Sequence, residues 1–299
     1  MGSVLDPRTL LLGLLALVAG GFALGWTLLL RASDPGRSAS CPAASSLAIG
    51  AVTNFFDTLG IGSFAPTTAL FRALHLVPDR LIPGTLNVGH ALPSVAQALV
   101  FIAIVQVEAR TLVLMIAAAI AGAWLGAGVV AGWSRRRVQI GMGWALLAAA
   151  ALLLRQLLLG APEGASAVTL DGTKLALAVG GNFVLGALMT IGVGLYAPCM
   201  ILVTLLGMNA TAAFPIMMGS CAFLMPFAGL RFIRADAYTP PVALGLTLGG
   251  VPAVLAAAFL VRSLPLDVVR WLVLVVAVYT ALAMLRAAAI EAEPPPARI

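Results

Sequence analysis

Apolar runs of about 20 residues recur along the whole chain and constrain its fold more than any other feature, because that length crosses a bilayer core as a helix. Hydrophobic residues make up 62% of the 299 positions and charged residues 9%, against roughly 25% charge in a typical soluble domain. Backbone groups in lipid must be satisfied by helices or closed barrels. Since the runs are continuous and do not alternate, the sequence predicts an all-α polytopic membrane protein.

The charged residues and the cysteines exclude several other classes. The net charge is +6, but basic residues occur one to three at a time between apolar runs, as orientation signals do, so no nucleic-acid partner is expected. Cys41, Cys199 and Cys221 are too scattered for a disulfide framework or a zinc site. We expect structural thiols, no metal site and no cofactor.

The first apolar run, over 9–30, is followed by Arg31. A signal peptide has a shorter apolar core with a small-residue cleavage site directly after it. We therefore predict that residues 1–40 form a retained N-terminal transmembrane helix and a loop.

A motif repeats inside the chain. The nine residues 58–66 return as 190–198 with five identities and three conservative changes, at a constant offset of 132. The apolar runs after each copy correspond in number and length, which indicates a duplicated unit. The first repeat is predicted over 41–159, the linker over 160–173, the second repeat over 174–287 and a disordered tail over 288–299.

Each repeat is predicted to contain one short-helix segment and three spans. The segments are 42–76 and 174–207, and the spans are 80–107, 111–133 and 138–159, then 211–232, 240–262 and 266–287. In the first segment we expect helices over 42–58 and 64–76, both short for a core about 30 Å thick. They form either one broken span or a re-entrant hairpin that enters and leaves on the same side.

The basic residues separate these two options. Hairpins put 11 of the 17 basic residues on one side and 6 on the other, whereas broken spans give 8 and 9. Because cytoplasmic loops are enriched in Lys and Arg, hairpins are favoured, with the N-terminus outside and the C-terminus in the cytoplasm of a bacterial-type inner membrane. Each repeat then crosses three times, so the second is inverted, a recurring plan of secondary transporters.

The hairpin motif suits an anion. Glycines permit a sharp reversal, and Pro66 or Pro198 is favoured in the first turn of the helix that follows. The free N–H groups and positive dipole end of that helix point at the tip, so two inverted hairpins predict an anion site made mainly of backbone. The predicted substrate-binding residues are Thr58, Gly60, Ile61, Gly62, Ser63, Thr67, Asn87, His90, Gly192, Gly194, Tyr196 and Ser220.

Two ionisable residues have alternative roles. Asp57 is an acid deep within an apolar segment, where acids are usually functional, and it either carries a coupling proton or sodium ion or caps the hairpin tip. His90 lies between Gly89 and Pro93 in a span that the prolines are expected to distort, and it is either a ligand or proton relay or a packing residue. The hairpin glycines similarly serve substrate contact or close helix packing.

The glycine-containing segments 59–62 and 191–194, in matching context, resemble the signature of the TauE/SafE sulfite exporter family. The resemblance covers residues 45 to 287 and implies a permease for sulfite, sulfonates or related organosulfur anions. The chain departs from the family pattern at Ser63 and Leu195, each followed by an aromatic residue, and in its additional N-terminal helix.

The main functional hypothesis is thus a secondary transporter of small anions. The alternatives are a passive anion channel and a permease for another small solute or metal ion. We expect no enzyme, since the sequence has no His-Glu-x-x-His motif, paired aspartates or Gly-x-Ser-x-Gly beside a base. The expected partners are the anion and membrane lipid, with a homodimer as one option for the oligomeric state.

Overall fold

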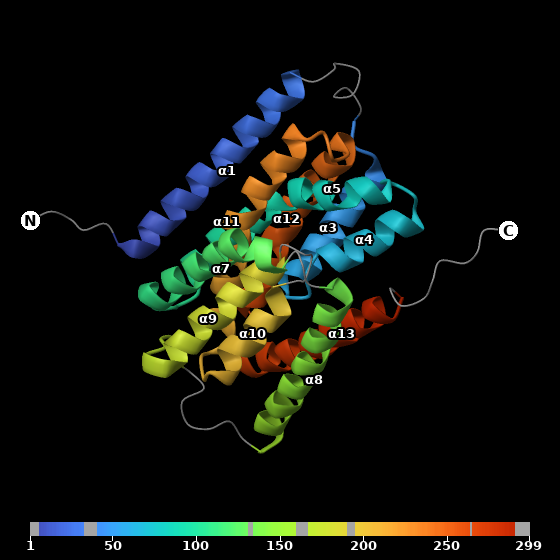
Figure 1. The fold of residues 1–299 in the computed structure, drawn as a ribbon. Coiled ribbons are helices and arrows are strands. Elements are labelled where there is room, and N and C mark those ends of the chain that lie inside the picture. Colours follow the sequence, from blue (N-terminus) through green and yellow to red (C-terminus); the bar gives the residue numbers. More distant parts are fainter. Residues whose placement is uncertain are drawn as a thin grey trace, which may run out of the picture. The chain divides into compact units, whose positions relative to one another are not determined.

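The computed structural model describes residues 6–32, 41–130, 134–159, 167–189, 195–263 and 265–290, and these residues form helices joined by short connections (Figure 1). The helices are α1 (Pro7–Ala32), α3 (Ala44–Thr58), α4 (Phe64–Ala73), η1 (Asp79–Leu81), α5 (Ile82–Gly89), α6 (Ala91–Ile104), α7 (Ala109–Val130), α8 (Arg135–Leu159), α9 (Gly172–Met189), α10 (Tyr196–Leu205), η2 (Ala210–Ala212), α11 (Ala213–Arg234), α12 (Pro240–Ser263) and α13 (Leu266–Ile290).

Seven helical segments of the described chain are long and apolar enough to cross a membrane. They are Pro7–Arg31, Asp79–Ile104, Arg136–Leu159, Gly172–Met189, Ala210–Arg234, Pro240–Val261 and Asp267–Ile290. Many of their large apolar side chains are exposed, including Leu17, Trp144 and Phe259, and a bilayer is the solvent that accommodates such surfaces. The chain is an all-α membrane protein, as the composition predicted.

One candidate span differs from the predicted set. Helix α9 (Gly172–Met189) has 18 residues and satisfies the length and composition of a span by itself, whereas the sequence predicted it as one arm of a hairpin over 174–207. The predicted span 111–133 corresponds to helix α7, which has 22 residues. Its part 109–125 is a shorter apolar helix and is not one of the seven candidate spans.

The first short-helix segment has the predicted helix limits within a few residues. Helix α3 ends at Thr58 and α4 begins at Phe64. The end of α3 is a Schellman motif, in which Ile61 N donates to Phe56 O at 3.2 Å and Gly60 N donates to Asp57 O at 2.8 Å. Gly60 has φ of 96°, which explains the glycine at this position.

The predicted span 80–107 contains a break at His90. Helix α5 ends at Gly89, α6 starts at Ala91, and His90 has φ of −93° and ψ of −3°. Pro93 has no N–H to donate to the carbonyl of Gly89 four residues earlier, and its ring also crowds that carbonyl. The distortion that the prolines predicted in this span is therefore present.

The chain divides into two compact units. Unit 1 comprises residues 1–116 and 214–264, and unit 2 comprises residues 117–213 and 265–299. Each unit thus takes segments from both predicted repeats: unit 1 combines α3 to α6 with α11 and α12, whereas unit 2 combines the end of α7 and α8 with α9, α10 and α13.

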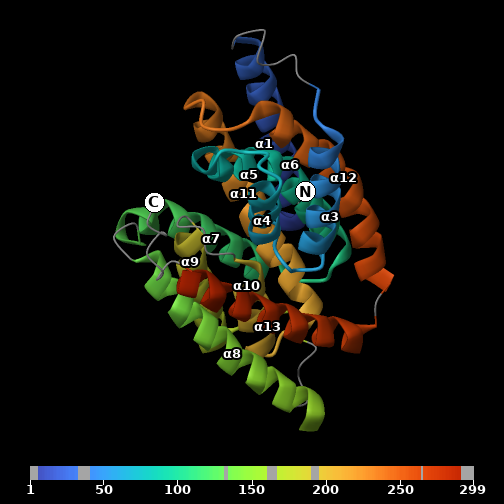
Figure 2. The same ribbon diagram turned by 90° about the vertical axis from the view of Figure 1, so that its right-hand side faces the viewer.

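In unit 1, helices α3 and α12 pack closely along their lengths (Figure 2). The contact depends on glycines, because a Cβ at Gly50 would lie 2.5 Å from the carbonyl oxygen of Leu246, and one at Gly249 would overlap the carbonyl oxygen of Leu47. Small residues let helix backbones approach in this way inside a membrane. The glycines therefore set the distance between the two helices.

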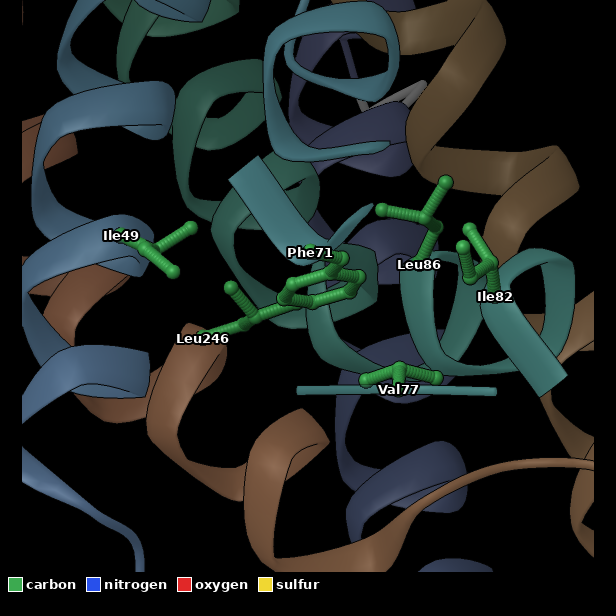
Figure 3. Packing of buried hydrophobic residues seen from close by; sticks show 6 residues of the cluster. All are labelled: Ile49, Phe71, Val77, Ile82, Leu86 and Leu246. Carbon is green, nitrogen blue, oxygen red and sulfur yellow. The ribbon is translucent and has the colours of Figure 1, made fainter. Parts of the chain in front are cut away.

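An apolar cluster fixes α4 within unit 1. Phe71 of α4 lies between α3, α5 and α12, against Ile49, Leu86 and Leu246 (Figure 3). Val77 and Ile82 complete the cluster, and Phe71 has no exposed surface. Its burial holds the end of α4 that lies away from the turn at 59–63.

In unit 2, α8 and α13 lie side by side, and α10 packs against α8, α9 and α13. A Cβ at Gly186 of α9 would overlap the carbonyl oxygen of Ala119 in α7, and one at Gly143 of α8 would lie 2.7 Å from the Leu285 side chain of α13. Glycine contacts therefore set helix distances in this unit as well.

Candidate functional site

Buried polar side chains of unit 1 gather where α3, α4 and α6 meet. They are Asn54, Asp57 and Thr58 on α3, Ser63 and Thr67 at the start of α4, His90 between α5 and α6, and Ser94 and Gln97 on α6, all at most 5% exposed. We call these eight residues the polar network. Uncompensated polar groups are costly in an apolar surrounding, so their mutual contacts decide whether this arrangement is stable.

The first part of the polar network joins α6 to the end of α3. Gln97 Nε2 donates to Asp57 Oδ2 at 2.8 Å and to Thr58 Oγ1 at 3.0 Å. Thr58 Oγ1 in turn donates to the carbonyl oxygen of Asn54 at 2.8 Å. One amide nitrogen of Gln97 thereby binds two side chains at the last turn of α3.

The second part joins α3 to α4 through the imidazole of His90. Asn54 Nδ2 donates to the carbonyl oxygen of Gly50 at 2.7 Å, and Asn54 Oδ1 lies 3.0 Å from His90 Nδ1. The other ring nitrogen, Nε2, lies 3.2 Å from Thr67 Oγ1. Asn54 belongs to both parts, since its main-chain carbonyl binds Thr58 and its side chain binds His90.

Apolar groups and a glycine enclose the imidazole. The Phe64 ring lies over it, with 6.0 Å between ring centroids. A Cβ at Gly250 of α12 would overlap the Asn54 amide and lie 2.9 Å from Pro93 Cγ. The glycine at 250 therefore leaves the space in which Asn54 reaches the ring.

The carboxylate of Asp57 lies next to the start of α4. The hydroxyl and backbone N–H of Ser63 face this carboxylate, and Ser63 is the residue that precedes α4. Free N–H groups at a helix start favour negative charge. The turn thus holds both an acid and a group of donors that would suit an anion.

The structure places several predicted site residues together and leaves others apart. Thr58, Ser63, Thr67 and His90 belong to the polar network, and so does Asp57. Gly60 and Gly62 form the turn between α3 and α4 with φ of 96° and 88°, and Ile61 lies between them.

Two predicted residues of unit 1 bind within their own helices. Asn87 is partly exposed, and its amide donates to the carbonyl oxygen of Pro83 at 2.9 Å. Ser220 is buried in α11 and donates to the carbonyl oxygen of Ile216 at 2.8 Å. Neither of these two bonds reaches the polar network.

The remaining predicted residues belong to unit 2. Tyr196 is the first residue of α10 and is buried. Gly192 and Gly194 lie outside the described residues, as do residues 160–166 of the predicted linker and 291–299 of the predicted tail.

Sequence reasoning missed Asn54, Ser94 and Gln97, although a signal was present. Asn54 precedes Asp57 and Thr58 by three and four residues, and Ser94 and Gln97 follow His90 by four and seven. These spacings put polar residues on one face of each helix. Polar stripes at helical spacing in apolar spans would therefore have identified the polar network.

The described residues contain no group of three or more His, Cys, Asp or Glu side chains that could hold a metal ion. Comparison with known proteins gives no match, since no family model, no curated protein and no solved structure is similar enough to this chain.

Proposed function

We propose that this protein is a secondary transporter of small anions, with sulfite or organosulfonate-type anions as the substrates. The observation that carries the proposal is the polar network of α3, α4 and α6, which combines a carboxyl group, an imidazole and the start of a helix inside an apolar, helical chain. Ionisable groups inside a membrane are usually functional, and substrate pathways and proton relays are among their roles. The sulfur chemistry of the substrate rests on the resemblance to the TauE/SafE family.

Corresponding local geometry in two segments supports the proposed inverted repeat. Helices α4 and α10 both have ten residues and start 132 positions apart, at Phe64 and Tyr196. They also end in the same hydrogen-bond pattern, with positive φ at His75 (50°) and Gly207 (95°). The two segments therefore correspond in local structure as well as in sequence.

The electrostatics of the turn decide which form of the site binds an anion. A helix start contributes about 0.3–1 kcal/mol at exposed sites and up to about 2 kcal/mol when partly buried. Ionised Asp57 beside Ser63 would repel the substrate more strongly than this. Asp57 therefore binds a proton before the anion enters, which makes the transporter a proton-coupled symporter.

The rival function is a passive anion channel that uses the same turn. The channel needs no proton uptake, and its flux stops when the anion gradient is dissipated. The described chain gives no separate support for a metal-ion permease, because its acids and histidines do not gather into a ligand group.

The test is sulfite flux in proteoliposomes that contain the full chain. With an inward proton gradient and equal sulfite on both sides, we expect net sulfite accumulation that an uncoupler abolishes. Accumulation that never exceeds the equilibrium level, with or without the proton gradient, would assign the protein to the channel class. If sulfite, methanesulfonate and thiosulfate all fail to move while a neutral solute is transported, the anion proposal is wrong.

A further inference from the structure

The protonation pattern of the His90 ring follows from the atoms around it. The Gly50 carbonyl oxygen can only accept a hydrogen bond, so the Asn54 atom 2.7 Å from it is the amide nitrogen. Asn54 Oδ1 therefore faces the ring and needs a donor, which assigns the ring proton to Nδ1. In the neutral ring, Nε2 then carries a lone pair and accepts the proton of the Thr67 hydroxyl.

This use of the Thr67 hydroxyl differs from that of other threonines in the same unit. Thr53, Thr58 and Thr85 each donate to the carbonyl four residues earlier in the chain, at 2.7 to 2.8 Å. Thr67 instead directs its hydroxyl to a histidine on another element. The hydroxyl proton of Thr67 is thus committed to His90 as long as the ring is neutral.

Proton uptake by the ring reverses this bond. A proton that adds to the Nε2 lone pair makes Nε2–H a donor, and Thr67 Oγ1 must then accept. The Thr67 O–H bond stays intact, but its hydrogen rotates away from the ring and becomes available to another acceptor. The same event gives the imidazole a positive charge next to the start of α4.

The polar network contains few groups that can gain or lose charge. Among the described residues, Asp57 and His90 are the buried acidic and basic side chains. The titratable side chains on the helices around His90 are Asp57 on α3, Arg72 on α4, Arg8 and Arg31 on α1, and Cys221, Arg231 and Arg234 on α11, whereas residues 240–261 of α12 contain none. Arg72 is exposed and pairs with Asp79 at 2.9 Å. A positive charge beside the turn can therefore arise at His90.

We propose that His90 and Thr67 bind the transported anion together with a proton, and that Asn54 is the positioning residue that makes Nε2 the atom that takes up this proton. The anion supplies the counter-charge that an imidazolium needs inside a membrane, so anion and proton favour each other's binding. Both side chains are fully buried, so the anion reaches them in a conformation in which α4 has moved from α6. The ligand in this inference rests on the proposed function, whereas the tautomer does not.

Nitrogen NMR of the imidazole in the full chain tests both the tautomer of His90 and the proton uptake that accompanies anion binding. The sequence has two histidines, and His75 is exposed, so a His75→Gln background leaves His90 as the one labelled ring. Without an anion at neutral pH, we expect a neutral ring with protonated Nδ1 and unprotonated Nε2. With methanesulfonate, an anion that does not itself titrate, we expect both nitrogens to be protonated and one proton to be taken up by the ring for each anion bound.

Two substitutions at Asn54 are expected to change the protonation of the His90 ring in opposite directions. Asn54→Asp keeps the acceptor beside Nδ1 and adds a negative charge, so we expect a doubly protonated ring even without methanesulfonate. Asn54→Leu removes the acceptor, so the preference for Nδ1–H is lost and anion-linked proton uptake falls at least several-fold. Recovery of the neutral Nδ1–H ring in Asn54→Leu would show that Asn54 has no positioning role.

The outcomes separate this inference from the proposed function. A neutral ring bearing its proton on Nε2 overturns the role of Asn54. If methanesulfonate raises the unfolding temperature but leaves the ring neutral, anion binding stands and the proton site at His90 is wrong. If neither methanesulfonate nor sulfite stabilises the protein, the proposed function and the anion part of this inference fail together, while the tautomer is still decided by the spectrum without anion.

Discussion

The hydroxyl of Thr247 on α12 donates a hydrogen bond of 2.8 Å to the carbonyl oxygen of Gly89, the carbonyl that Pro93 leaves without its helical partner. An unsatisfied carbonyl is costly in an apolar interior. Thr247 therefore compensates the break in the helix from another element, and it allows His90 to leave the regular α-helical path at the polar network.

Thr247→Val tests this compensation, since valine keeps the volume and removes the donor. The buried Gly89 carbonyl is left without this partner, which is expected to cost about 1–3 kcal/mol. Thermal unfolding of the purified protein in detergent measures the loss. The matched control is Thr53→Val, because buried Thr53 donates to the carbonyl oxygen of Ile49 in its own helix. This variant is expected to lose less stability than Thr247→Val. Equal losses in both variants would contradict the role of Thr247.

Gln97→Leu is expected to reduce anion flux and its proton dependence. The substitution removes the amide that binds both Asp57 Oδ2 and Thr58 Oγ1, so the carboxyl group loses a donor that orients it. Initial rates of sulfite uptake across a series of pH values measure the effect. Gln106→Leu, at an exposed glutamine just after α6, serves as the control and should keep the wild-type pH profile.

Asp57→Asn is expected to weaken the dependence of anion flux on the proton gradient, because a neutral amide cannot bind and release a proton and His90 is then the proton-binding group that is left. Net accumulation of sulfite then falls while equilibrium exchange continues. Proteoliposome flux with and without an imposed gradient distinguishes the two activities. Wild-type accumulation in Asp57→Asn would leave this carboxyl group with a structural role at the end of α3.

Gly250→Ala is expected to disrupt the contact between Asn54 and His90. The added methyl group would overlap the Asn54 amide and lie 2.9 Å from Pro93 Cγ. Overpacking of this kind costs about 1–3 kcal/mol, and it displaces the group that orients the imidazole. Unfolding temperature and sulfite flux should both fall.

Gly180→Ala on α9 is the control, because a Cβ there meets no heavy atom within 4 Å. Alanine also has the higher helix propensity, so this variant should be neutral or slightly stabilising. If Gly180→Ala lowered the unfolding temperature and the sulfite flux as much as Gly250→Ala does, the effect would come from the added methyl group in general.

The stability of variants at Gly60 should reflect how well each residue tolerates a positive φ. The residue has φ of 96° at the end of α3, where an L side chain costs about 1–2 kcal/mol. We expect Gly60→Ala to lower the unfolding temperature and Gly60→Asn to lower it less, since asparagine tolerates this region better. The reverse order would show that the turn adopts another conformation in the membrane.

Local sequence signals predicted the elements around the polar network. The short helices over 42–58 and 64–76 appear as α3 and α4, and the glycine at 60 adopts the positive φ that its place after a helix end suggests. The prolines of the span 80–107 predicted the distortion at His90. These features depend on residues close in the chain, so steric and hydrogen-bonding rules for short segments determine them.

The partners across helices were decided by tertiary structure. Asn54 meets His90 over 36 positions and Gln97 meets Asp57 over 40, and the sequence had singled out one member of each pair. Thr247 reaches Gly89 across 158 positions, a contact that depends on where α12 packs. The sequence by itself determined the apolar helices, their breaks and the polar residues on their faces. Which polar residues bind each other depended on the distances between helices, and glycines such as Gly250 set those distances only once the chain had folded.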